Sequence, residues 1–197
     1  MRFLVFILSL LFSTGIFAQD QRVQRTFKDT RAVNVHSVET LPARKLDVRI
    51  SHRFGDMFGD AGGWPTFYGL ETASDVAIGA EYGFTDRLTA GIYRTKGAGS
   101  TPDGDASLRQ LLNFVAKIRL LHQTEDNKMP ISAALVGTAS LSTSTKIEGN
   151  ENLIRSFPKF APRIAFNAQL VLARQFVNSL SLQLIPGLTH RNLVPFA

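Results

Sequence analysis

The chain has 197 residues, with 22 Lys and Arg against 16 Asp and Glu, which gives a formal net charge of +6. This length suits one domain with a sizeable core, or one barrel. The basic residues are spread along the chain, whereas a nucleic-acid interface would gather them on one helix or patch. Cys is absent, which excludes disulfide bonds, thiolate metal sites, a catalytic thiol and a lipid-acceptor cysteine.

Residues 1–18 have the pattern of a secretory signal peptide. Met1-Arg2 gives a positive start, Phe3 to Phe12 form an apolar core, and STGIFA ends on the small residue Ala18. A single membrane anchor is the alternative, but the apolar stretch is shorter than the roughly 20 residues that a spanning helix needs. We therefore predict export with cleavage after Ala18, followed by a polar periplasmic segment over residues 19–44.

From Lys45 onward the chain alternates apolar and polar residues with a period of two, which predicts β-strands. In the first such segment, KLDVRISHRFGD, the residues Leu46, Val48 and Ile50 alternate with charged ones. One segment, SLRQLLNFVAKIRLL, also fits a helical stripe, and we favour a strand because Leu112 to Leu120 form an unbroken alternate row. The seven predicted strands are Lys45–Phe54, Asp75–Phe84, Leu88–Thr95, Leu108–Leu121, Ile131–Leu141, Arg163–Phe176 and Leu180–Thr189.

Short and long connections alternate along the chain. TDR, HQTEDNKMP and VNS are short or of middling length, whereas Gly55–Ser74, Lys96–Ser107 and Ser142–Pro162 are long. Short periplasmic turns, long external loops and strands of about 10 residues are typical of transmembrane β-barrels. The sequence therefore predicts an all-β fold, an antiparallel up-and-down transmembrane β-barrel with an apolar exterior. A soluble exported β-sandwich that binds a ligand is the alternative, because its strands also alternate.

Aromatic residues fall where the two membrane interfaces are expected. Tyr82, Phe84 and Phe176 lie beside short turns, where a periplasmic aromatic girdle belongs, and the first long loop contains Trp64, Phe67 and Tyr68.

Several linked stretches resemble a known family. SVETLP, LDVRISHRFGD and FYGLETASDVAIGAEYGFTDRLTAGIYRTK occur in this order and are similar to an uncharacterised β-barrel domain family of exported Bacteroidota proteins. The likeness covers roughly residue 26 to the end. It implies an outer-membrane location and a barrel fold, and it brings no activity, substrate or catalytic residue.

The strand count points to an incomplete barrel. Bacterial outer-membrane barrels have an even number of strands, and the sequence offers seven. The last residues, THRNLVPFA, resemble the start of a further external loop, and Pro195 is poorly tolerated in a paired strand. We therefore expect residues 45–197 to be the N-terminal portion of a barrel domain. Arg31–Val38 is a candidate eighth strand.

The predicted lumen is rich in cations. Six basic residues against two acidic ones predict an interior that favours small anionic solutes, and the alternative is a filled interior of paired charges. Outer-membrane lipid and lipopolysaccharide are the expected surroundings. The predicted inward charges are Asp47, Arg49, Arg53, Glu81, Arg109, Lys117, Arg119 and Arg163.

No chemical motif is strong. His36, Ser37 and Glu39 are hydrolase residue types, but neighbours on a strand cannot converge as nucleophile, base and orienter, so a turn or plug segment near the periplasmic mouth is favoured. The four His residues lack metal-ligand spacing, and no cofactor is expected. We predict an outer-membrane barrel, porin-like or structural, that is not an enzyme. The alternative is a membrane-embedded lipid or lipopolysaccharide hydrolase with His52 near a Ser and an acid.

Overall fold

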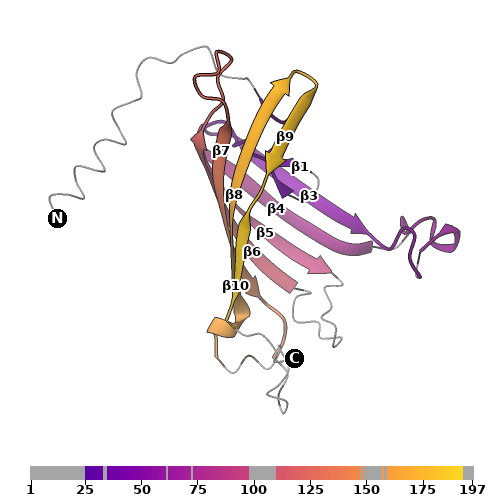
Figure 1. Ribbon diagram of the computed structural model, residues 1–197. Coiled ribbons are helices and arrows are strands. Elements are labelled where there is room, and N and C mark those ends of the chain that lie inside the picture. Colours follow the sequence, from indigo (N-terminus) through magenta and orange to yellow (C-terminus); the bar gives the residue numbers. More distant parts are fainter. Residues whose placement is uncertain are drawn as a thin grey trace.

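The computed structural model describes residues 25–32, 35–60, 62–71, 73–97, 110–146, 148, 157 and 159–192. Most of them form one antiparallel sheet that curls into a half-barrel (Figure 1). Its strands are β3 (Leu46–Phe54), β4 (Ala73–Thr85), β5 (Leu88–Gly97), β6 (Gln110–Leu121), β7 (Ser132–Ser142), β8 (Ile164–Val177), β9 (Leu180–Leu184) and β10 (Gly187–Arg191).

Each strand from β3 to β8 pairs with its neighbours in sequence, so the predicted up-and-down order is confirmed. The segment that also fitted a helix is strand β6, paired along its length with β5 and β7. The short connections meet at one end of the sheet, which we call the short-turn end. The long connections meet at the other end.

The last predicted strand is broken into β9 and β10, which both pair with β8. Leu184 faces Leu172 and Gly187 faces Gln169, so the register continues across the break without a slip. Pro186 explains the interruption, because it has no N–H to donate to β8. Its carbonyl oxygen still accepts a hydrogen bond from the Leu170 N–H at 2.9 Å. The two pieces thus form a seventh strand with one missing ladder bond.

The candidate eighth strand, Arg31–Val38, does not join the barrel sheet, so the predicted count of seven strands is confirmed. The short strands β1 (Arg31–Ala32) and β2 (Val35–His36) pair only with each other and form a separate two-stranded sheet. The hydrogen-bonding groups of this segment are used against the inner surface of the half-barrel, as described below, instead of adding to its edge.

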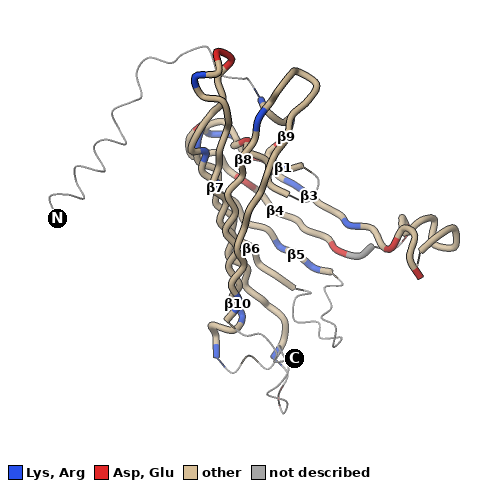
Figure 2. Tube along the Cα trace, viewed as in Figure 1, with Lys and Arg blue, Asp and Glu red and all other residues tan. Residues whose placement is uncertain are grey.

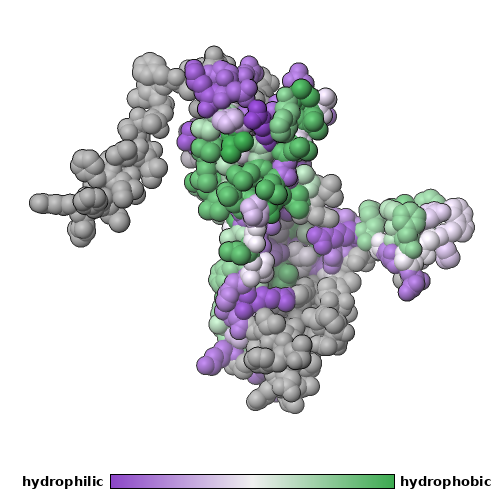
Figure 3. Space-filling model, viewed as in Figure 1, coloured by the Kyte–Doolittle hydropathy of each residue, from purple (hydrophilic) through white to green (hydrophobic). Residues whose placement is uncertain are grey.

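The outward face of the sheet is apolar from strand to strand. One cross-strand row consists of Val48, Ala80, Ile92, Phe114, Ala139 and Phe166. Figure 3 shows part of this face as a green patch over β7, β8 and β9. Among the described residues, 28 large hydrophobic side chains are exposed and only nine hydrophobic residues are buried. This distribution is inverted relative to a soluble domain, where most large apolar side chains lie inside.

The β-sandwich alternative is therefore wrong. A sandwich would bury the outward row between two stacked sheets. Instead Leu46, Val48, Ile78 and Leu182 are 64, 68, 53 and 58% exposed. In the described part of the chain no second sheet covers them.

Aromatic side chains gather at both ends of the sheet. At the short-turn end, the rings of Tyr82 and Phe84 meet edge to face with centroids 5.1 Å apart. At the other end, the 3₁₀-helix η1 (Trp64–Thr66) sits in the β3–β4 loop, and Trp64 contacts Phe67 in the same manner at 5.9 Å. A second 3₁₀-helix, η3 (Ala161–Arg163), leads into β8. No helix among the described residues is long and apolar enough to cross a membrane.

Candidate functional site

Residues 25–44, which we call the inner segment, lie on the concave face of the half-barrel. They have little secondary structure of their own and contact the strands through side chains. Their hydrogen bonds reach β3, β4, β5, β6 and β9, so the inner segment crosses the concave face from one side of the sheet to the other. Figure 2 shows that charged residues of several strands also lie in this region.

Lys117 of β6 fixes the inner segment most directly. Its side chain is only 1% exposed. The ammonium group donates to the backbone carbonyl oxygens of Thr30, Ser37 and Glu39 at 2.7, 3.1 and 2.9 Å. Three donors thus meet three acceptors, which satisfies a buried ammonium completely. Because the acceptors are backbone atoms, this contact specifies the path of the inner segment and not its side chains.

A second contact joins Arg31 of the inner segment to Glu81 of β4. Arg31 Nη2 donates to Glu81 Oε1 at 3.0 Å, and the carboxylate is 2% exposed. The Tyr93 hydroxyl donates to the same oxygen at 2.7 Å, while the Arg31 guanidinium lies 4.5 Å above the Tyr93 ring. A buried carboxylate needs such compensation to remain charged. Glu81 and the inner segment therefore depend on each other.

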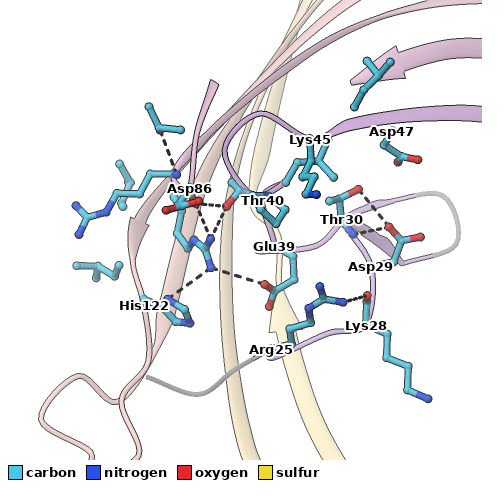
Figure 4. Close-up of a pocket in the computed structure, with 18 of the residues that line it drawn as sticks. Arg25, Lys28, Asp29, Thr30, Glu39, Thr40, Lys45, Asp47, Asp86 and His122 are labelled. Carbon is cyan, nitrogen blue, oxygen red and sulfur yellow. Dashed lines mark hydrogen bonds and ion pairs between the residues drawn. The ribbon is translucent and has the colours of Figure 1, made fainter. Parts of the chain in front are cut away.

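At the short-turn end a third contact surrounds Arg119 of β6. Its guanidinium donates to the Asp86 carbonyl oxygen at 2.7 Å and to the Thr40 hydroxyl, and it lies 3.7 Å from the Glu39 carboxylate (Figure 4). The Glu39 carboxylate also accepts the Thr26 N–H at 2.8 Å. Arg119 therefore joins the β4–β5 turn to both ends of the inner segment.

On β3, Arg49 joins two carboxylates. It donates to Asp29 of the inner segment at 2.7 Å and to Asp47 at 2.8 Å. The hydrogen bond from Arg49 lowers the pKa of the Asp29 carboxyl below its ordinary value, with the Arg49 charge acting in the same direction. Asp29 therefore stays ionised at any neutral pH.

Apolar packing completes the docking of the inner segment. Val38 is 1% exposed and belongs to a small core with Val115, Val136 and Val171, against which Phe27 is partly buried. Gly83 of β4 leaves room for the chain here, since a Cβ at that position would lie 2.1 Å from the Pro42 carbonyl oxygen. Gly83 is thus the position of β4 where the inner segment approaches the strand most closely.

The remaining predicted inward charges lie elsewhere. Arg53 is 3.6 Å from Asp75 near the long-loop end of β3 and β4. Arg163 belongs to η3, where it donates to the Ser142 and Ser144 carbonyl oxygens and lies over the Phe157 ring. Arg109 lies outside the described residues. Asp47, Arg49, Glu81, Lys117 and Arg119 are the five predicted residues that the structure brings together around the inner segment.

The hydrolase residue types have structural partners. The Ser37 hydroxyl donates to the Asp29 carbonyl oxygen, and Glu39 binds backbone N–H groups and Arg119. His52 packs edge to face on Phe54 at 4.6 Å, and within the described chain no hydrogen bond joins it to a Ser or an acid. Across the same residues, no group of three or more His, Asp or Glu side chains is placed to hold a metal ion.

The sequence interpretation missed the contacts between the inner segment and the strands. Arg31 and Glu81 are 50 positions apart, and Lys117 is 87 positions from Thr30, so neither pairing has a local motif. The available signals were indirect. They were the small inward residues Gly79, Gly83 and Gly91, and a Lys placed in the middle of a long strand.

Searches of curated proteins and of solved structures give no match. A family model does match over residues 27–197, and that range includes both the inner segment and the sheet. Its description, a membrane-bound β-barrel domain, agrees with the exposed apolar exterior and the polar, charged concave face. The chain belongs to the family of membrane bound beta barrel domains known as DUF5777.

Proposed function

We propose that the protein is an outer-membrane β-barrel whose lumen is closed at the periplasmic end by the inner segment acting as a plug. The short-turn end would face the periplasm, as in bacterial barrels with short periplasmic turns. The surroundings would be outer-membrane lipid and lipopolysaccharide, and the signal-peptide pattern of residues 1–18 supports export.

The single observation that carries the proposal is the burial of Lys117 against three backbone carbonyls of the inner segment. If the inner segment left, the Lys117 ammonium would lose its three acceptors and the Glu81 carboxylate would lose Arg31. Both groups would then need water as a partner, and water reaches them only when the lumen is open. The buried charges are therefore satisfied in two states of the barrel, by the docked segment or by water. A pore that opens and closes needs two such states.

The open state would retain the predicted preference for anions. In the docked state Arg49 and Arg119 are neutralised partly by Asp29 and Glu39 of the inner segment. Release removes these two acids together with the segment's own basic residues, and it uncovers Lys117 beside Arg49 and Arg119 on the barrel wall. The proposed function is therefore a porin-like barrel, closed at rest, that passes small anionic solutes when the plug is released.

Planar-bilayer conductance of the full-length protein tests this proposal. We expect the wild type to be mostly closed and Lys117→Met to raise the open probability severalfold, because the variant leaves three carbonyl oxygens unpaired. Lys96→Met, an exposed lysine at the far end of β5, is the matched control and should behave as wild type. In asymmetric salt the reversal potential of the open state should indicate anion preference.

Three outcomes would count against the proposal. A wild type that conducts as steadily as Lys117→Met would show that the inner segment does not close the lumen. If no variant conducts, the pore is contradicted and a structural role for the barrel is favoured. If the open state prefers cations, only the proposed selectivity for anions is contradicted.

A further inference from the structure

A cavity of about 1060 Å³ lies at the short-turn end, between the inner segment and the barrel wall (Figure 4). Its walls come from the inner segment, the start of β3, the β4–β5 turn and the end of β6. The volume is at the upper end of the range for small-molecule sites, roughly 300–1,000 Å³. Several residues that dock the inner segment lie on its walls and leave the space between them open, namely Asp29, Glu39, Thr40, Arg49 and Arg119.

The cavity is lined by six basic side chains, Arg25, Lys28, Lys45, Arg49, Arg87 and Arg119, and by four acidic ones, Asp29, Glu39, Asp47 and Asp86. Six positive and four negative charges give a formal excess of two positive charges. His122 also lies on its wall and contacts Arg119. A concave surface with an excess of one sign concentrates ions of the opposite sign.

The acidic side chains already have protein donors. Asp29 and Asp47 accept from Arg49, Glu39 accepts the Thr26 and Phe27 N–H groups, and Asp86 accepts the Ala43 N–H. All four carboxylates are therefore partly satisfied before any ligand arrives.

The basic side chains are not satisfied to the same degree. Only Arg49 and Arg119 lie within ion-pair distance of a carboxylate. In the described part of the chain, Lys28, Lys45 and Arg87 make no side-chain hydrogen bond or ion pair, and Arg25 donates only to the Lys28 carbonyl oxygen, at 3.4 Å. Four cationic groups thus face one cavity without a counter-charge.

We propose that this cavity binds an anion that carries two or more phosphate-type charges. Phosphate oxygens accept hydrogen bonds from several Lys and Arg donors at once, and the spread of cations around the cavity suits an extended anion better than a single charge. Two of the free cations, Arg25 and Lys28, belong to the inner segment, and Lys45 and Arg87 belong to the barrel wall.

A bound anion would bridge these two pairs of cations and relieve their mutual repulsion. This coupling rests on the proposed plug, since the anion would hold the inner segment docked. Binding itself does not depend on the plug's role in conductance.

Two kinds of ligand carry phosphate-type charges. Leu46, Leu120 and Leu121 also line the cavity and are 64, 49 and 38% exposed, so apolar side chains at the short-turn end adjoin the basic ones. The ligand is therefore either a soluble phosphate compound or the headgroup of an anionic lipid.

Isothermal titration calorimetry of the full-length protein with pyrophosphate, at low ionic strength, is the first arm of the test. The double variant Lys45→Gln/Arg87→Gln removes two free cations from exposed positions, and we expect it to weaken binding at least tenfold. The matched control, Lys96→Gln/Lys128→Gln, removes the same charge from outside the cavity and should change binding less than twofold. Circular dichroism confirms that each variant keeps its sheet.

The second arm uses nanodiscs of phosphatidylglycerol or of phosphatidylcholine, without pyrophosphate, and measures protection of inner-segment amides from hydrogen exchange. Protection in phosphatidylglycerol alone, lost in the cavity double variant and kept in the control, would identify a lipid headgroup. Pyrophosphate binding without this difference would identify a soluble ligand.

The proposal is overturned if neither probe binds, or if the cavity and control variants lose binding equally, which would indicate bulk charge. Failure of the conductance experiment alone leaves the anion site intact. Failure of the binding arms alone leaves the plug intact.

Discussion

At the scale of single residues, buried charged side chains organise the concave face of the half-barrel. Among the described residues, Lys117 and Glu81 are the two largest fully buried side chains, and each is compensated by the inner segment. A buried charge and its partner favour one docked position of the inner segment more than they raise total stability, because the cost of desolvation offsets most of their attraction. Removing one partner, by contrast, leaves the other charge buried without compensation.

Glu81→Gln tests this at the centre of the network. The substitution keeps the size of the side chain and removes the charge that Arg31 and Tyr93 share. We expect docking of the inner segment to weaken by about 1.5–3 kcal/mol, the range for hydrogen bonds to charged groups. Hydrogen exchange of the inner-segment amides measures it.

Tyr93→Phe is the control for Glu81→Gln, because it removes one hydrogen bond and keeps the carboxylate and Arg31. Because this bond joins β5 to β4 and does not reach the inner segment, we expect docking to weaken by no more than about 1 kcal/mol. Equal effects of the two variants would mean that the ion pair does not hold the segment.

Gly83→Ala tests the close approach of the inner segment to β4. The added methyl group would meet the Pro42 carbonyl oxygen at 2.1 Å, so the segment must shift, at a cost of about 1–3 kcal/mol. Gly137→Ala is matched to it, since no atom lies within 4 Å of a Cβ at that position. Limited proteolysis within residues 25–44 should be faster in Gly83→Ala and unchanged in Gly137→Ala.

At the scale of elements, strands and inner segment are stabilised differently. The strands hold one another through continuous ladders, and even Pro186 removes only a single bond of the last one. The inner segment contains two strands of two residues each and depends on side chains of the sheet. An element held by a few contacts opens at a lower free energy than the sheet around it. It is therefore the part that conditions can move without unfolding the barrel.

Acid should release the inner segment through His36. Burial, together with the charges of Lys117, Arg31 and Arg49, lowers the pKa of His36 to about 3 from its ordinary 6.5. Two acids of the same network, Glu39 and Glu81, are already paired with Arg119 and Arg31. Because docking favours the neutral imidazole, its contribution is complete above pH 6.5 and declines as the pH falls toward 3.

At pH 4.5, two units below the ordinary pKa, this decline amounts to about 2.7 kcal/mol at 1.36 kcal/mol per unit. Hydrogen exchange of residues 26–40 between pH 7.5 and 4.5, corrected for intrinsic rates, measures it. Asp29, whose pKa is also lowered, acts in the same direction but only below its ordinary pKa of 3.8. His36→Gln should flatten the profile over this interval. A profile that keeps its slope in the variant would assign the effect to another group.

At the scale of the whole molecule, the half-barrel has an apolar outside and a polar inside. Nothing in the described chain covers the outward rows, and lipid is the solvent that such a surface suits. The two ends differ as well, with a compact short-turn end that contains the inner segment and a long-loop end with exposed aromatic residues. The molecule is thus polarised both across the sheet and along the strands.

Ile92→Arg tests the lipid-facing assignment. Ile92 lies in the middle row of outward residues and is 45% exposed. A charge there should destabilise the inserted barrel by about 2–4 kcal/mol, the cost for an arginine near the bilayer midplane. Ser51→Arg, on the inward face of β3, should cost less than 1 kcal/mol. Denaturant titrations of the protein folded into liposomes compare them, and equal costs would contradict the assignment.

Much of the fold could be predicted from the sequence because alternation is a local property. Leu46, Val48 and Ile50 against Asp47 and Arg49 already separate the two faces of β3, and the same rule identifies the other strands. The split at Pro186 was not predicted, although proline chemistry explains it. The hairpin of β1 and β2 was misassigned, because two-residue strands have too few positions to show which surface they face.

The amino-acid sequence by itself determined the strands, their order and the apolar exterior, since all three follow from a period of two and from the lengths of the connections. Only the tertiary structure decided where residues 25–44 lie and what Lys117 binds. The reason is physical: the acceptors of Lys117 are backbone carbonyls, which every residue has, and they are brought to it across 78 to 87 positions of the chain. Curling the sheet, and not any local motif, turns these distant groups into one site.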